Sequence, residues 1–381
     1  MLRIWARDAA LKRQGTLKAL GGKVLLKRTG VGGFHLEVEA STAAAQAFTK
    51  GWGVIVQEDD QFLFSGPASK IRRQFTNGAH LLVLEGETDL RPLADRDVYP
   101  SPDQASSSQS VVSHWVRTDV PAETAIVDLV NANVSNGAPL TYRRESFFRP
   151  ATSQGRGSTV SISARWTKVL AEVQALANTG GLVVDAGQVN PGQPFVDLLV
   201  RVPRDLSRVV RFTPEKGLGD YWVELEEPTT TTVAVGGGGT GTDRSIWGLS
   251  VNDAWGDRRR EAFLDRRDTT SVDAYRRTAE EHGAETAEKA AAGFTITETS
   301  RYKLGRDFLL GDVVSVYAGE ELEAAEIITG PVTSADLEWD GHGRTVDLRV
   351  GENVAGASDM PASLEKARKL ERRLSRMEGG Q

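Results

Sequence analysis

A glycine-rich stretch from Thr229 to Arg244, TTTTVAVGGGGTGTDR, is the part of the sequence that looks most like a cofactor motif. Gly236, Gly238 and Gly241 satisfy G-x-G-x-x-G, the spacing at which a loop can bind the pyrophosphate of a dinucleotide. Such a site also needs a buried parallel strand before the glycines and a helix directly after them. Here the preceding residues are threonine-rich and alternate in polarity, and no helical stripe follows. The sequence therefore predicts a flexible connector between two blocks of strands and no cofactor.

No other set of residues has the spacing of a catalytic or metal site. None of the five histidines belongs to an H-E-x-x-H pattern or lies at ligand spacing from another histidine: His35, His80, His114, His282 and His342. The chain has no cysteine, which excludes disulfides, thiolate metal sites and a cysteine nucleophile. There is no G-x-S-x-G motif for a serine hydrolase. We therefore predict no metal and name no catalytic residue.

Paired carboxylates leave one enzymatic alternative open. Asp59 and Asp60 are adjacent, as are Glu226 and Glu227. Glycoside hydrolases use two carboxyl groups at a defined separation, and a sequence does not give that separation. A cell-wall hydrolase therefore remains an alternative at this point.

Five arginines form a dense cluster in the second half of the chain. They are interleaved with four acidic residues, so the local charge nearly cancels: Arg258, Arg259, Arg260, Arg266 and Arg267, with Asp257, Glu261, Asp265 and Asp268. A surface that binds nucleic acid would carry an unbalanced positive charge, whereas this pattern is typical of a salt-bridged turn or a subunit contact. We take Arg258, Arg259 and Arg260 as candidate subunit-interface residues.

Composition sets broad limits on the protein. The 381 residues are 39% apolar and 26% charged, which is typical of a globular protein long enough for two or three domains. Lys and Arg number 46 and Asp and Glu 52, a formal charge of -6 that disfavours tight binding to nucleic acid. No apolar run approaches the ~20 residues that a membrane-spanning helix needs. We therefore expect no membrane-spanning segment.

Strand patterns dominate residues 1–100, which we predict to be a first β domain. Phe34, Leu36 and Val38 alternate with polar residues, as in a half-buried strand. The stretch WGVIVQEDDQFLFSG predicts a hairpin with a tight turn at Glu58 to Gln61. The Ser- and Gln-rich residues 101–112 are the predicted linker to the next domain.

Residues 113–245 mix helices and strands, and we predict a separate α+β domain there. Thr118 or Asp119 can cap a helix over PAETAIVDLVNANV, and a second helix over RWTKVLAEVQALANTGG should end at Gly180 or Gly181. Residues 246–355 are predicted to be a second β domain. This range includes an alanine-rich helix over roughly 272–291, which precedes the later strands of the domain.

The last segment, residues 356–381, is predicted to be helical. Ala367, Leu370, Leu374 and Met377 are spaced by three, four and three residues, the seam of a short coiled coil. Two turns of such a seam bury too little area to hold an oligomer alone. We take these four residues as further candidates for a subunit interface.

Five stretches of the sequence, taken in order, resemble minor tail proteins of siphoviruses that infect actinobacteria, which build the hub of the tail tip. The stretches are GGFHLEVEASTAAAQAFTKGWGVIVQEDDQFLFSGPASKI, LEGETDLRPLADRDVYPSP, PRDLSRVVRFTPEKGLGDYWVELEEPTTTTVAVGGGG, RRREAFLDRRDTTSVDAY and YKLGRDFLLGDVVSVY. The resemblance implies an α+β, mostly β fold. It consists of two small β-barrel hub domains, a lateral α/β region between them and a C-terminal helix.

The resemblance also implies a function at the tail tip of the virion. Three chains would form a baseplate hub that joins the tail tube to tip or fibre proteins and lines the DNA channel. The implied partners are two further copies of the chain, distal tail or tube proteins, the tape measure protein and tip or fibre proteins, with DNA passing without specific binding. The implied role is structural and not enzymatic. The alternatives are a tail-associated cell-wall hydrolase that acts during entry and a receptor-binding module at the tail periphery.

Overall fold

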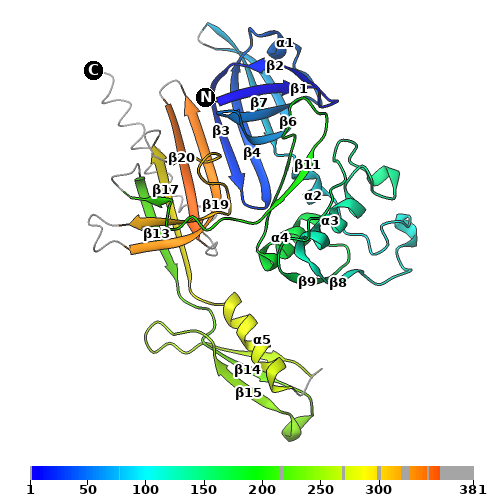
Figure 1. Cartoon of the computed structure of the whole chain (residues 1–381), viewed down its shortest axis with the longest axis vertical. Helices are drawn as coiled ribbons and strands as arrows, with labels where there is room; N and C mark the ends of the chain where they lie inside the picture. The colour runs from blue at the N-terminus through cyan, green and yellow to red at the C-terminus, as the bar shows by residue number, and fades with distance from the viewer. Residues whose placement is uncertain are drawn as a thin grey trace. The chain divides into compact units, whose positions relative to one another are not determined.

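Alternating apolar residues in the N-terminal part of the chain build a block of antiparallel strands. The computed structural model describes residues 2–76, 78–213, 218–267, 271–297, 302–318, 326–340 and 343–351 (Figure 1). The elements of this first β block are β1 (Leu2–Arg7), β2 (Arg13–Leu17), β3 (Ala19–Lys27), β4 (Gly30–Glu39), α1 (Ala43–Ala47), β5 (Gly53–Glu58), β6 (Gln61–Thr76) and β7 (Ala79–Glu87). Phe34, Leu36 and Val38 of β4 are buried in the core, as the alternation predicts.

The predicted hairpin between β5 and β6 is confirmed. Glu58 pairs with Gln61, so the turn consists of Asp59 and Asp60 alone. Both have positive φ, 48° and 64°, the conformation of a two-residue turn whose twist matches that of the flanking strands. Aspartate is among the residues that adopt this conformation at least cost.

The C-terminal part of the chain forms a second β block that pairs directly with the first. Its strands are β12 (Arg211–Phe212), β13 (Leu218–Glu226), β17 (Lys289–Thr297), β18 (Val313–Ala318), β19 (Glu326–Asp340) and β20 (Gly343–Gly351). Strand β19 pairs antiparallel with β3, in a register that places Trp339 opposite Gly22 and Ser334 opposite Lys27. Figure 1 shows β3 and β19 in this arrangement. One hydrophobic core contains residues of both blocks.

The fold is mostly β, as expected. Among the described residues the main sheet has 13 strands, in the order β13-β17-β20-β19-β3-β4-β7-β6-β5-β1-β2, with β18 paired to β19 and β12 to β18. This order is open at both ends, and the pairings between described residues do not close into two separate barrels. Instead, the pairing of β3 with β19 joins the two blocks into one sheet.

Residues 88–203, here called the α/β region, contain most of the helices and a core of their own. Its elements are α2 (Arg91–Asp95), β8 (Trp115–Pro121), α3 (Ala122–Asn133), β9 (Thr159–Ala164), α4 (Val169–Gly180), β10 (Val183–Gly187) and β11 (Asp197–Arg201), with short 3-10 turns at Ser106–Ser108 and Thr141–Arg143. Helices α3 and α4 pack together, and β8 and β9 lie beside them (Figure 1). The end of α4 at Gly180 agrees with the sequence pattern.

One detail of this region, the cap of α3, differs from the sequence analysis. Neither Thr118 nor Asp119 caps α3: both belong to β8, and the residue before the helix is Pro121. The reason is that β8 stays paired with β9 as far as Pro121, opposite Thr159. Within residues 101–112, whose role as a linker between domains stays a prediction, the side chain of the buried Gln109 bonds the backbone N–H and carbonyl of Ser101 at 2.9 and 2.8 Å.

Contacts within the chain define two units, and the second is a small α/β unit. Unit 1 consists of Met1–Tyr221 and Gly293–Val350, and the described part of unit 2 consists of residues 222–267, 271–292 and Gly351. Besides the ends of β13 and β17, unit 2 contains β14 (Thr232–Gly236), a 3-10 turn (Gly241–Asp243), β15 (Ile246–Ser250), β16 (Glu261–Asp265) and α5 (Val272–Glu285). Its sheet has the order β15-β14-β16, and α5 packs on it around Val233, Val235, Tyr275 and Ala279. Helix α5 ends earlier than the predicted residue 291 because β17 begins at Lys289.

The glycine-rich stretch lies inside unit 2 and forms a hairpin loop, so its interpretation as a connector between blocks is wrong. It joins β14 to β15, which pair antiparallel from Gly236 opposite Ile246. Gly239 and Gly241 have positive φ, 105° and 56°, a conformation that glycine adopts without steric cost. At these two positions glycine therefore suits the shape of the turn.

Gly237 allows the closest approach in this loop, and its replacement gives a testable prediction. A Cβ atom at residue 237 would lie 1.7 Å from the hydroxyl oxygen of Tyr275, which is buried in the core of unit 2. We expect Gly237→Ala to destabilise unit 2 by about 1–3 kcal/mol, because overpacking forces a buried ring to move. Limited proteolysis should then cleave within residues 222–292 faster than in the parent protein. Gly248→Ala is the control, because Gly248 also lies in unit 2 without a positive φ and its Cβ would meet only the carbonyl oxygen of Val233, at an ordinary contact distance of 3.8 Å. Equal cleavage of both variants would contradict the packing argument.

Candidate functional site

The residues singled out from the sequence lie in separate places, and the structure does not assemble them into one site. After the glycine loop the chain continues into strand β15, so the strand-to-helix turn of a dinucleotide site is not formed there. Asp59 and Asp60 form the β5–β6 turn in unit 1, whereas Glu227 of unit 2 pairs with Arg258 and Arg260. His35 lies 3.6 Å from carboxylate oxygens of Glu37 and Glu85 on the surface of the sheet. No group of three or more potential metal ligands occurs among the described residues.

The arginine cluster is largely engaged in ion pairs within unit 2. Arg258 lies 3.1 Å from Glu227, Arg259 lies 2.6 Å from Glu261, and Arg260 also pairs with Glu227. The side chains of Arg258 and Arg259 are nevertheless 72% and 67% exposed, so they can still reach a neighbouring molecule. Their role in a subunit contact remains a prediction. Ala367, Leu370, Leu374 and Met377 lie outside the described residues.

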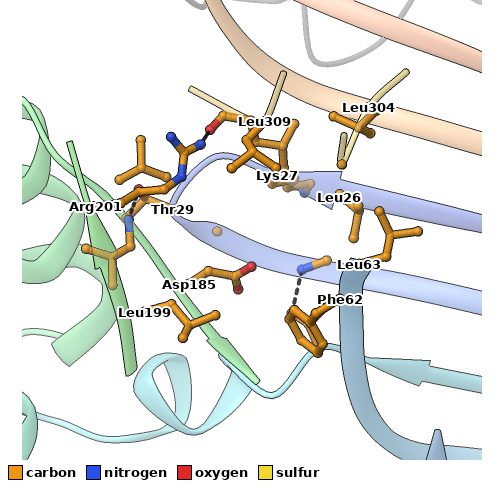
Figure 2. Close-up of a pocket in the computed structure, with 17 residues that line it drawn as sticks. Leu26, Lys27, Thr29, Phe62, Leu63, Asp185, Leu199, Arg201, Leu304 and Leu309 are labelled. Atoms are coloured by element: carbon orange, nitrogen blue, oxygen red, sulfur yellow. Dashed lines mark hydrogen bonds between the residues drawn. The ribbon is translucent and has the colours of Figure 1, made fainter. Parts of the chain in front are cut away.

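A partly open cavity of about 190 Å³ within unit 1 is a site that sequence reasoning missed (Figure 2). It lies where the α/β region meets both β blocks, and its wall is mainly leucine: Leu26, Leu63, Leu199, Leu304, Leu309 and Leu310. Asp185 of β10 contributes a carboxyl group to this wall. Figure 2 shows that group directed into the space that the leucines and Phe62 surround.

The apolar surroundings change the acidity of Asp185. Burial disfavours the charged form of a carboxyl group and raises the pKa of Asp185 to about 7. The backbone N–H of Ala186, which donates to Oδ1 at 2.8 Å, and the charge of Arg201 act in the opposite direction, whereas the charge of Asp89 adds to the rise. Asp185 therefore changes its charge near neutral pH. A carboxyl group in an apolar site is a feature of some catalytic acids, and the other polar side chains that line this cavity are Lys27, Thr29, Thr88 and Arg201.

Two buried ionic clusters hold the α/β region to the β blocks. In the first, Arg7 of β1 forms two hydrogen bonds with Asp89, at 2.6 and 2.8 Å, and both side chains are more than nine-tenths buried. Ser65 donates to Asp89 at 2.6 Å. Gln188, at the end of β10, accepts a hydrogen bond from Arg7 at 3.3 Å and donates to the carbonyl of Leu11 at 2.8 Å. This cluster therefore links the first β block to the α/β region.

The second cluster is centred on Asp312, which is completely buried. It accepts hydrogen bonds from the guanidinium of Arg201 at 2.8 Å and from the guanidinium of Arg204 at 2.6 and 3.0 Å. It also accepts from the backbone N–H groups of Arg204 and Leu309, both at 3.0 Å. Burial alone would raise the pKa of Asp312, but these hydrogen bonds outweigh it and hold the pKa below its usual value. The cluster fastens the end of β11 to the loop before β18.

Sequence reasoning missed all of these residues for a common reason. Arg7 and Asp89 are 82 residues apart in the sequence, and Arg204 and Asp312 are 108 apart. No local pattern marks residues that meet at such separations. The only available signal is weak: Asp185 interrupts the apolar strand LVVDAG with a single acidic residue.

Three solved structures of tail proteins have a similar fold. A tail protein from Neisseria meningitidis MC58 has 12% identity and a TM-score of 0.56, covering 92% of this chain and 97% of that one. The 43 kDa tail protein of prophage MuSo2 from Shewanella oneidensis has 11% identity and a TM-score of 0.56, covering 91% and 97%. Prophage tail protein gp18 from Listeria monocytogenes EGD-e has 10% identity and a TM-score of 0.54, covering 96% and 99%. At these identities the comparisons show a shared fold.

The sequence matches the model of a known family, although it matches no individual curated protein. No helix among the described residues is both long and apolar enough to span a membrane. The family model described as Siphovirus ReqiPepy6 Gp37-like protein matches residues 1–352, which confirms the resemblance to siphovirus tail proteins. The chain therefore belongs to the family of Siphovirus ReqiPepy6 Gp37-like proteins.

Proposed function

We propose that this protein is a structural component of the phage tail tip, a trimeric baseplate hub that joins the tail tube to tip or fibre proteins. The observation that carries the proposal is the fold that it shares with phage tail proteins along more than nine-tenths of both chains. The family match to a siphovirus protein over residues 1–352 agrees with it. The role is mechanical and requires no cofactor or catalytic group.

The arrangement of the β blocks suits such a role. We take the first and second β blocks as the two hub domains of one chain, so that three chains supply six. The two blocks share one core and one sheet, which makes them a stiff pair. At the end of the sheet order, β2 pairs only with β1 among the described strands. Unpaired strand edges bind further strands readily, and in a closed ring each edge would be covered by a neighbouring chain.

The remaining partners follow from the position of a hub. Tube proteins would lie on one side, and the tape measure protein and DNA would pass through its centre. The formal charge of -6 is compatible with a channel that lets DNA slide, because tight binding to DNA depends on contacts from Lys and Arg to phosphates. In this proposal the exposed Arg258 and Arg259 contact carboxylates of a neighbouring chain.

The test is the number of chains in the assembly. Purified full-length protein should have three times the mass of one chain in light scattering at micromolar concentration, and a reconstruction of intact tails should show three copies at the tip. Replacing both Arg258 and Arg259 with Glu should shift the mass towards one chain, because like charges would then face each other across the contact. Arg165→Glu, an exposed arginine of the α/β region, should leave the trimer intact. A single copy per tail, or copies along the shaft, would overturn the proposal.

A further inference from the structure

Strand β10 is attached to the first β block at two points, and Asp185 lies between them. Before Asp185, the backbone N–H of Val184 donates to Oγ1 of Thr29 at 3.0 Å. After it, the backbone N–H of Gln188 donates to Oγ of Ser65 at 2.8 Å. Both hydrogen bonds are buried. The carboxyl group between these two attachments faces the cavity described above.

The neighbouring charged groups already have other partners. Arg201, on the adjacent strand β11, is paired with Asp312 at 2.8 Å, and Asp89, which follows β7, is paired with Arg7. Asp185 itself forms no ion pair among the described residues. The third charged group at the cavity, Lys27 of β3, is solvent-exposed. None of these groups forms a close ion pair with the half-buried carboxyl group of Asp185.

The other walls of the cavity carry no titratable side chain. Strand β6 contributes Phe62 and Leu63, and β4 contributes glycine backbone. The segment 304–310 contributes leucines and Gly305. Packing on this part of β10 is also close, because a Cβ atom on Gly187 would lie 2.3 Å from the ring of Phe62. The ionised carboxylate of Asp185 therefore gains little electrostatic stabilisation from the walls of the cavity.

We propose that Asp185 and the two hydrogen-bonded attachments of β10 form a proton-dependent latch between the α/β region and the first β block. With a proton on the carboxyl group, the neutral side chain is compatible with the apolar cavity and the contact stays closed. When the proton passes to solvent water, the carboxylate is better solvated with β10 released from the sheet than with it attached. Because burial raises the pKa of Asp185 to about 7, the change falls near neutral pH.

The sign of the effect follows from the direction of the shift. In the closed state Asp185 binds its proton up to about pH 7, whereas in a solvated open state it loses the proton near pH 4. The closed state therefore binds more protons between these values, and its stability falls as pH rises through this window. The latch does not depend on the number of chains in the assembly.

Hydrogen–deuterium exchange of the full-length protein tests the latch. After correction for intrinsic exchange rates, amides of β10 and β11 should exchange about tenfold or more faster at pH 8 than at pH 5, since one pKa unit corresponds to a tenfold change in an equilibrium. In Asp185→Asn, which has a similar shape and cannot ionise, the corrected rates should be the same at both pH values. Amides of α5 in unit 2 should show no such difference in either protein.

Asp197→Asn is the matched control. Asp197 lies on β11 opposite Gly187 and pairs with Arg149 at 2.6 Å, so this variant removes a carboxylate from the same pair of strands but not from the cavity. It should keep the pH dependence of the parent protein. Equal exchange at both pH values in the parent protein overturns the latch, as does a pH dependence that Asp185→Asn retains. If Asp185→Asn does not fold, the parent protein alone decides the question. A midpoint below pH 5 in its plot of corrected exchange rate against pH overturns the proposal.

Discussion

Replacing Asp89 with alanine should lower the free energy of unfolding of unit 1 by about 3–5 kcal/mol. Asp89 balances the charge of Arg7, whose side chain is only 2% exposed. Without Asp89, the guanidinium would be buried with no opposite charge, and Ser65 would lose its acceptor. Urea denaturation followed by tryptophan fluorescence measures the loss, and the transition of unit 1 should move to lower urea concentration.

Two further variants show whether the buried charge is the cause. The double variant Arg7→Met with Asp89→Leu removes both charges and should recover much of the lost stability, because apolar residues can replace a buried ion pair. Asp95→Ala removes an exposed partner of Arg91 and should cost at most about 1 kcal/mol. If Asp89→Ala cost no more than Asp95→Ala, the cluster would not hold the α/β region in place.

The replacement of Asp312 with alanine should cost about 2–4 kcal/mol, somewhat less than the loss of Asp89. Asp312 is completely buried, but its two partners are not: the side chains of Arg201 and Arg204 are 27% and 49% exposed and can bind water instead. The buried N–H groups of Arg204 and Leu309 would lose their acceptor, which accounts for much of the remaining cost. Asp128→Ala, which breaks a half-exposed pair with Arg117, is the surface control, with an expected loss of at most about 1 kcal/mol.

Asp312 and Asp185 should give opposite responses to pH. The pKa of Asp312 is lowered in the folded protein, so its contribution to stability is present above about pH 4 and is lost as pH falls through the folded pKa. Unfolding measured from pH 6 to pH 3 should therefore be less dependent on pH in Asp312→Asn than in the parent protein. An unchanged slope would show that Asp312 does not contribute to acid sensitivity.

The sequence determined the elements whose causes are local. The turn at Asp59 and Asp60 follows from two adjacent aspartates between apolar runs, and the end of α4 follows from consecutive glycines. The alternation in β4 fixed which side chains face the core, because the side chains of a strand point to opposite faces in turn. The family resemblance, which depends on the order of several such stretches, came from the sequence as well.

Tertiary structure decided the features that depend on residues far apart in the chain. The five glycines look alike in the sequence, and only the pairing of β14 with β15 shows that they form a hairpin loop. The pairing of β3 with β19 made one sheet where two closed barrels were expected. Asp89, Asp185 and Asp312 are ordinary aspartates in the sequence, and the side chains that the fold brings around them give each its role. The physical reason is that local conformational preference acts over a few residues, whereas burial and pairing depend on which distant segments the folded chain brings together.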